Sequence, residues 1–225
     1  MAEEFRERDL RGARFVESDL SGVVIRGSEV SGLAIDSPWL LDGDPVTVNG
    51  VDITGYVEGE LNRRFPGREL WRATDPEGLR EAWRAAVAAW DAVIGRAPEA
   101  LVDEEVDGEW SFATTLRHLV HATDLWLGQS VLGWSREEFH PLGVGYGQVA
   151  EPAPYADVLA ARASRVALVR EFLADVTPEV LVEPRPQPHE PERTVTVCHC
   201  VQVVMEESWE HLRFAVRDLD ALERA

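Results

Sequence analysis

Three residues of this chain have the types and the spacing of a metal site. Glu207 and His211 stand four positions apart in a segment with helical periodicity. Four residues make about one helical turn, so the two side chains project from the same face. His118, on an earlier apolar segment, would be a third ligand if the two helices are neighbours. One carboxylate and two imidazoles around a divalent ion leave positions open for metal-assisted chemistry. The alternative is three ordinary residues, because Glu-x-x-x-His is common on helices.

Four segments with helical periodicity must position these residues. We predict helices at 75–95, at 111/112 to about 132, at 155–176 and from Thr194 to the C-terminus. The segments HPLGVGYGQVAEPAP and PRPQPHEPERT separate the last three and are not helical, because they are rich in Gly and Pro. Both loops are placed to border a pocket. Four long helices favour a four-helix bundle.

A helical wheel of the last segment divides an apolar stripe from a charged face. At about 100° per residue, His211 falls within the stripe and Glu207 on its flank. A carboxylate turned towards a core needs a partner, because an unpaired buried charge is costly. That partner is either a metal ion or an arginine from a neighbouring helix. The opposite face, which we expect in solvent, holds Glu206, Glu210, Arg213 and Arg217.

On the second predicted helix, two histidines compete for the inward position. His118 shares a face with Ala122 and Leu125, whereas His121 lies nearer the polar side. We therefore select His118 as the candidate ligand; the alternative is a core histidine bonded to a backbone carbonyl. His140, before Pro141, is a candidate for touching a substrate or thiol, and otherwise caps or packs its loop.

The remaining residues with chemical potential favour structural roles. His189 lies in the Pro-rich loop and is expected to be exposed. Cys198 and Cys200 point to different sides if helical, which favours free core thiols over a disulfide. Tryptophans more often pack in a core than form a stacking platform for a ligand. We therefore assign three of them to the core: Trp110, Trp126 and Trp209.

The first 35 residues repeat with a period of five, which fits neither a helix nor a strand. The apolar positions are Phe5, Leu10, Phe15, Leu20, Ile25, Val30 and Ile35. The segment resembles the pentapeptide-repeat family, a resemblance that implies a right-handed β-helix with the central Leu or Phe inward. Seven repeats make under two coils, so we interpret the segment as a structural cap or dimer-forming appendage. A hairpin at Asn49-Gly50 and a short helix at 56–64 follow.

The composition limits the partners of the chain. A formal net charge of −19 in 225 residues disfavours nucleic acid and anionic membranes, which carry the same sign. No apolar run reaches eighteen residues, and the first residues form no secretory signal, so we expect a cytoplasmic protein.

Two segments carry a second resemblance. WSFATTLRHLVHATDLWLG and VVMEESWEHLRFAVRDLDALE resemble the second and fourth helices of the DinB-like superfamily of metal-binding bundles. A histidine combined with Glu-x-x-x-His is similar to the mycothiol-dependent maleylpyruvate isomerases within it. The resemblance implies that His118, Glu207 and His211 are the ligands, the same three that the wheels select. Two features depart from the pattern: position 212 is Leu rather than histidine, and the isomerases lack the N-terminal segment.

Together these features imply a mainly α protein: a DinB-like four-helix bundle at 74–225 after a small β-rich, pentapeptide-repeat-like module at 1–73. The resemblance implies a divalent ion, zinc or alternatively nickel, and mycothiol or a similar thiol as co-substrate. The ion would activate the thiol or water for thiol transfer or isomerisation on a small electrophile. The alternative is a non-catalytic metal-binding scaffold. For both functions, the sequence leaves open whether the protein is a monomer or a homodimer.

Overall fold

A computed structural model of the chain describes residues 4–41 and 43–224. It divides into two compact units, Met1–Ser37 and Pro38–Ala225, which we describe one at a time. The sequence-based division lies later, between residues 73 and 74. Residues 38–73 therefore belong to the same structural unit as the long helices. The first three residues, part of the segment used to judge a secretory signal, lie outside the described residues.

The first unit carries the five-residue period in its backbone. Residues 4–37 contain no helix or strand. A positive φ recurs every fifth residue, at Glu7, Gly12, Glu17, Gly22, Gly27 and Gly32. The apolar row that the repeat predicts to point inward is 45–64% exposed. The backbone of this short coil turns regularly, but the coil encloses too little space to bury its own row of apolar side chains.

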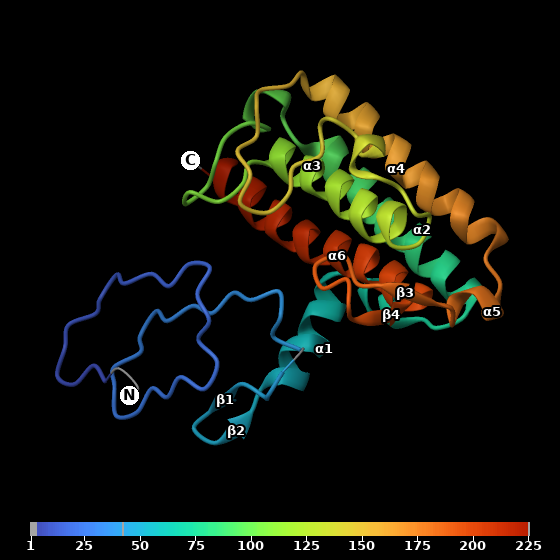
Figure 1. The fold of residues 1–225 in the computed structure, drawn as a ribbon. Coiled ribbons are helices and arrows are strands. Elements are labelled where there is room, and N and C mark those ends of the chain that lie inside the picture. The colour runs from blue at the N-terminus through green and yellow to red at the C-terminus, as the bar shows by residue number, and fades with distance from the viewer. Residues whose placement is uncertain (1–3, 42, 225) are drawn as a thin grey trace. The chain divides into compact units, whose positions relative to one another are not determined.

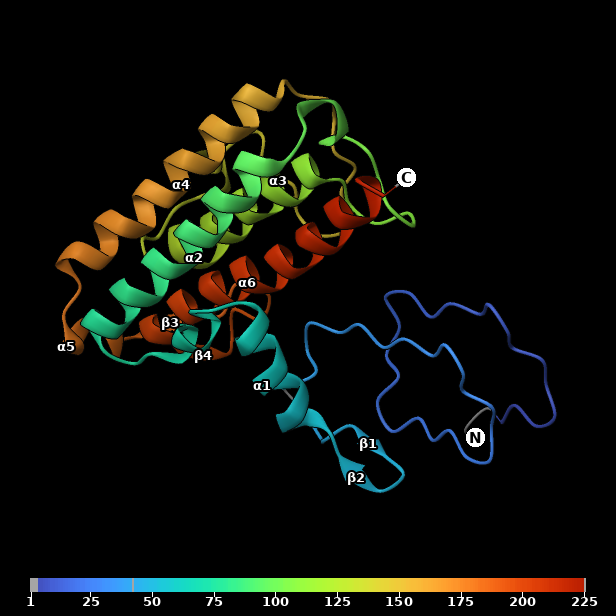
Figure 2. The same cartoon turned by 180° about the vertical axis from the view of Figure 1, so that it is seen from behind.

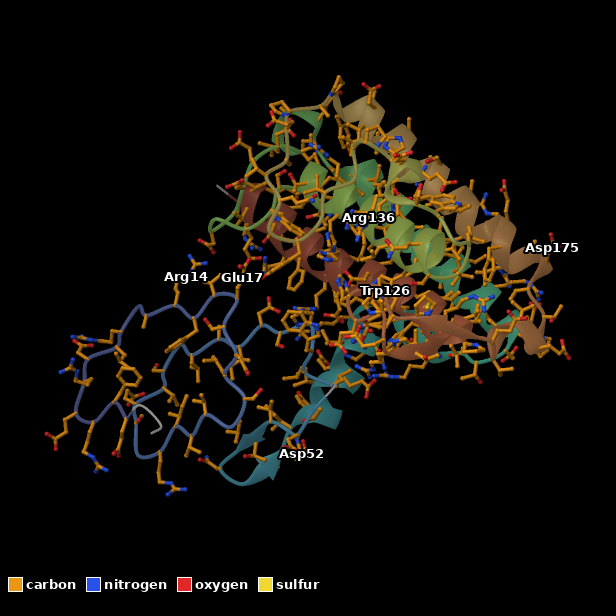
Figure 3. All side chains as sticks on the ribbon, viewed as in Figure 1. Arg14, Glu17, Asp52, Trp126, Arg136 and Asp175 are labelled. Carbon is orange, nitrogen blue, oxygen red and sulfur yellow. The ribbon has the colours of Figure 1, made fainter. Side chains whose placement is uncertain are left out.

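A short hairpin and a helix open the second unit. Strands β1 (Thr47–Val48) and β2 (Val51–Asp52) pair antiparallel, as predicted. Asn49 and Gly50 between them have φ of 51° and 79°, the left-handed conformation that this tight turn requires. Helix α1 (Thr54–Arg64) follows. Figure 2 shows the hairpin and α1 from behind, and Asp52 is labelled in Figure 3.

The described residues of the second unit form four long helices, three of which begin at a side-chain cap. They are α2 (Pro76–Arg96), α3 (Phe112–Thr123), α4 (Tyr155–Asp175) and α6 (Val197–Leu222). Asp75 accepts hydrogen bonds from the first turn of α2, Ser111 caps α3 and Thr196 caps α6. Asp175, labelled in Figure 3, ends α4. The short elements are 3₁₀ helices η1 (Arg68–Arg72), η2 (Glu99–Leu101) and η4 (Arg136–Glu138), and helix α5 (Pro178–Leu181).

Two predicted helix bounds were wrong. The last helix does not start at Thr194, because strand β4 (Thr194–Thr196) pairs with β3 (Pro184–Pro186) and the helix begins after it. The second predicted helix stops being α-helical at Thr123 and continues as a π-helical turn, η3 (Asp124–Gln129). The Gly/Pro-rich loops lie outside the long helices, as predicted.

The long helices pack around one apolar core. Helix α2 contacts α4 and α6, and α3 contacts the same two helices, so their lengths run alongside one another (Figure 1). The largest fully buried side chains come from all four: Leu79, Leu116, Leu119, Leu173, Met205, Leu212 and Leu219. Among the described residues, no helix is both long and apolar enough to cross a membrane.

One charged residue expected in solvent lies inside this unit. Glu210 is 7% exposed, because Arg68 of η1 packs over it and donates to its Oε1 at 3.0 Å. Arg213 binds the other oxygen, and Asn62 accepts from Arg68 at 2.8 Å. The helical wheel placed Glu210 correctly on its own helix, but could not show that η1 covers that face. The buried pair joins η1 to α6.

Replacing Glu210 with Ala tests this join. The substitution leaves the guanidinium of Arg68 buried without its carboxylate, which typically costs about 3–5 kcal/mol. Asp220→Ala is the matched control, because Asp220 is also on α6 but forms an exposed pair with Arg96. We expect the control to lose no more than about 1 kcal/mol. Urea unfolding of both variants measures the difference, and equal losses would contradict the role of the buried pair.

Candidate metal centre

Helices α3 and α6 bring the three sequence-selected ligands together. One ligand atom each from His118, Glu207 and His211 lies within 4.8 Å of the others. Both imidazoles approach the same carboxylate oxygen: Nε2 of His118 is 3.3 Å, and Nε2 of His211 is 3.1 Å, from Oε2 of Glu207. The helical spacing explains the second distance, because Glu207 and His211 are one turn apart. The first depends on the packing of α3 against α6.

The hydrogen bond at the far side of His118 defines what faces Glu207. Its Nδ1 lies 3.1 Å from the carbonyl oxygen of Val144. A carbonyl only accepts, so Nδ1 carries the proton, and in a neutral imidazole Nε2 then carries a lone pair. A lone pair directed at a carboxylate oxygen is unfavourable unless a cation lies between them. A second proton or a metal ion meets that requirement, so the donor set fits a divalent ion.

The charge states at the other two residues suit a ligand role. Burial alone would raise the pKa of Glu207, but the hydrogen bonds and charge of His118 and His211 lower it well below its usual range. Burial lowers the pKa of His211, and the positive charge of His118 adds to this, while Glu207 acts in the opposite direction. A charged carboxylate and a neutral imidazole at pH 7 are the forms that bind metal.

Aromatic rings surround the imidazoles. The indole of Trp110 lies 4.7 Å from the ring of His118, and 6.0 Å from that of His211, nearly parallel to it. Phe214 meets His211 edge-on, and Tyr146 meets Trp110 in the same way. The Glu207 side chain keeps 32% of its surface exposed, against 12% for His118 and 16% for His211. The carboxylate is thus the most accessible of the three.

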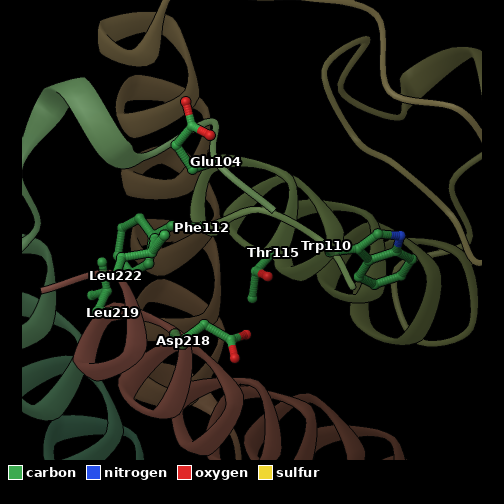
Figure 4. Close-up of a pocket in the computed structure, with 8 residues that line it drawn as sticks. Glu104, Trp110, Phe112, Thr115, Asp218, Leu219 and Leu222 are labelled. Carbon is green, nitrogen blue, oxygen red and sulfur yellow. The ribbon is translucent and has the colours of Figure 1, made fainter. Parts of the chain in front are cut away.

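A small hollow shares Trp110 with the centre, but none of the three candidate ligands lines it. It has a volume of about 10 Å³, which is roughly the space of one water molecule. Figure 4 shows its lining, which includes Trp110, Thr115 and Asp218. An organic molecule therefore does not fit in this hollow, and the accessible part of the centre itself is the exposed side of Glu207.

The other candidate histidines lie outside the three-residue cluster. Nδ1 of His140 accepts a hydrogen bond from the backbone N–H of Leu142, and the backbone N–H of His140 donates to Asp124. His140 therefore holds its loop in place. His140 also lines an open hollow against α4 with Asp157 and Arg165. His121 faces Phe139 and the loop, whereas the exposed His189 lies edge-on to Trp126.

The cysteines and two of the tryptophans are structural, as predicted. Cys198 and Cys200 are both free thiols. Burial raises the pKa of Cys200 to about 11, which makes it a poor nucleophile at neutral pH. Trp126 and Trp209 are 8% and 2% exposed, within the core. Figure 3 labels the first of them.

Sequence reasoning missed two participants. Trp110 was assigned to the core, yet it is half-buried against the two imidazoles. Its place directly before the cap residue Ser111 was the signal, since this position overhangs the first turn of α3. Val144 contributes only its backbone carbonyl, and no side-chain pattern marks such a contact.

Comparison with known proteins gives one match. Residues 79–215 match the DinB superfamily, and this stretch holds all three candidate ligands. No curated protein and no solved structure matches the chain significantly. The matched stretch spans more than half of the 225 residues. The chain belongs to the DinB superfamily.

Proposed function

We propose that His118, Glu207 and His211 hold one divalent ion, zinc or alternatively nickel, in a DinB-type four-helix bundle. The observation that carries the proposal is the convergence of both Nε2 atoms on one oxygen of Glu207. Two histidines and one glutamate with open positions form a common catalytic zinc set. Bound there, the ion would supply Lewis acidity and lower the pKa of a thiol or water.

The chain's own residues would then serve a small-molecule reaction. Glu207 offers the exposed approach, and the rings of Trp110 and Phe214 shield the imidazoles from water. We propose thiol transfer or isomerisation on a small electrophile, with mycothiol or a similar thiol as co-substrate. The support is the family membership together with the Glu-x-x-x-His pair. A cytoplasmic location is part of this proposal.

A non-catalytic metal-binding scaffold is the second candidate. The burial of two of the three candidate ligands favours it, because the side chains of His118 and His211 are only 12% and 16% exposed. A structural site would be closed, with four protein ligands and no exchangeable position. The two candidates therefore differ in whether a thiol can reach the ion.

Metal binding is the first test. We expect purified protein to bind one Zn²⁺ or Co²⁺ per chain, measured by isothermal titration and metal analysis. Glu207→Gln should weaken binding by more than the roughly 10–100-fold that outer-shell changes cost. Glu206→Gln, the neighbouring residue with the same chemical change, should bind like wild type. Equal binding by all three proteins would contradict the site.

Thiol access separates the two candidates. Adding mycothiol or cysteine to Co²⁺-loaded protein should produce a near-ultraviolet sulfur-to-cobalt absorption band, because the site keeps open positions. His211→Ala should lack the band. A loaded protein that shows no band, and whose melting temperature collapses on chelation, would favour the scaffold instead.

We also propose that the first unit mediates a homodimer. Its period-five apolar row is 45–64% exposed, and stacked repeats normally bury such a row against neighbouring coils. A second copy offers the same five-residue period, so its coils can stack in register. Five arginines against eight acidic residues in 1–37 also leave little of the chain's negative charge to oppose the contact.

Light scattering of the full chain tests this assembly. We expect a dimer that Ile25→Asp converts to a monomer, since the substitution places a charge in the row. Val24→Asp is the matched control: Val24 is the adjacent residue, is 71% exposed and lies off the row. A monomeric wild type, or equal effects of the two substitutions, would refute the proposal.

A further inference from the structure

The loop between η4 and α4 crosses helix α3 at the candidate ligand His118. The backbone of Val144 bonds to α3 twice: its N–H donates to the carbonyl of Arg117 at 3.2 Å, and its carbonyl accepts from Nδ1 of His118 at 3.1 Å. Val144 itself is 3% exposed. The loop is thus fixed to α3 at two consecutive residues, Arg117 and His118.

The side chain of Arg117, which precedes His118 on α3, also binds this loop. It is buried, with Nε donating to the carbonyl of Leu142 at 2.8 Å and Nη1 donating to that of Glu151. One residue of α3 therefore binds the loop before and after Val144. The neighbouring position on the helix is His118, so this arginine and the candidate ligand share one turn.

Glycines on either side of Val144 allow this close approach. A Cβ at Gly143 would lie 3.2 Å from the carbonyl oxygen of His140 and 3.4 Å from Cα of His121. A Cβ at Gly145 would lie 3.0 Å from Nε2 of His121. A Cβ at Gly145 requires the loop or the His121 ring to give by a few tenths of an ångström, and a Cβ at Gly143 presses on the His140 carbonyl of the loop itself while touching α3 at His121. Either strain acts on the backbone next to the Val144 carbonyl.

We propose that Gly143-Val144-Gly145 is a positioning strap for His118. It holds the proton on Nδ1 and so keeps the Nε2 lone pair directed at the place where Glu207 and His211 converge. The strap thereby prepares His118 as a ligand before an ion arrives. This inference rests on the proposed metal site for its purpose, but the tautomer that it fixes is measurable without metal.

The two candidate histidine ligands, His118 and His211, are held in different ways. His211 is oriented by its own helix and by the nearly parallel Trp110 ring at 6.0 Å. His118 also touches Trp110, at 4.7 Å, and within the described residues the hydrogen-bond partner of its Nδ1 is the strap carbonyl of Val144. Outer-shell partners of this kind fix the ring orientation of metal-binding histidines and raise their basicity.

The experiment compares Gly143→Ala and Gly145→Ala with Gly147→Ala in the full chain. Gly147 lies in the same loop at φ of +72°, and a Cβ there meets nothing within 4 Å, so it tests loop strain without displacing the strap. Nitrogen-15 NMR of apo-protein at pH 8.5, where an imidazole is ordinarily neutral, reads the His118 tautomer. Cobalt titration reads affinity.

We expect the Nδ1–H tautomer in wild type and in Gly147→Ala, and its loss in the two strap variants. Their Co²⁺ affinity should fall by about 10–100-fold. Adding His121→Ala to Gly145→Ala removes the clashing ring and should restore both readings, with His121→Ala alone as reference. Strap variants that keep the tautomer, or a Gly147→Ala variant that loses it, would overturn the inference.

If wild type binds no Co²⁺, the proposed metal function fails while the NMR comparison still decides the strap. If wild type binds Co²⁺ and the strap variants bind it equally well, the metal function stands and the strap is refuted. The two failures are therefore distinguishable.

Discussion

The arrangement of the centre depends on a single carboxylate oxygen. Oε2 of Glu207 receives the approach of two imidazole nitrogens, at 3.3 Å and 3.1 Å, from two different helices. Because Nδ1 of His118 is committed to a carbonyl, the contact on that side is favourable only with a second proton on Nε2 or a metal ion between the two atoms. The packing of α3 against α6, the loop that crosses α3 and the ring of Trp110 all meet at this point. Each of them helps to hold an imidazole beside the carboxylate.

Two buried arginines join the elements that surround the centre. Arg68 and Glu210 join η1 to α6 one turn from Glu207, and Arg117 joins the loop to α3 beside His118. Both arginines are buried; Arg68 is paired with Glu210, and Arg117 donates to two backbone carbonyls. Buried charged groups are costly to separate from their partners. A shift of α3 against α6 would separate the ligand atoms. The buried arginines thus oppose the distortion that mutual repulsion of the polar groups would otherwise cause.

The sequence predicts the parts that local periodicity determines. The four helices, the Asn49-Gly50 hairpin and the choice of His118 over His121 all follow from spacing and caps within one segment. At two places where distant segments meet, the prediction failed. Glu210 looks solvated until Arg68, 142 residues earlier, covers it, and Thr194–Thr196 looks helical until Pro184–Pro186 pairs with it. The Val144 carbonyl could not be predicted for another reason. Every residue has a backbone carbonyl, and only the fold places this one at His118.

The charge of the cluster constrains the chemistry further. With a divalent ion, one charged Glu207 and two neutral imidazoles leave a single positive charge. Glu210, the nearest other carboxylate on α6, does not alter this, since Arg68 and Arg213 already engage it. In a half-buried site uncompensated charge is costly, so a singly charged anion brings the centre to neutrality, whereas a doubly charged one exceeds it. A histidine in place of Glu207 would leave two positive charges and favour a different ligand. In the proposed centre the glutamate would favour a monoanion such as a thiolate, and the nearby Trp110 and Phe214 rings would strengthen that preference by excluding water.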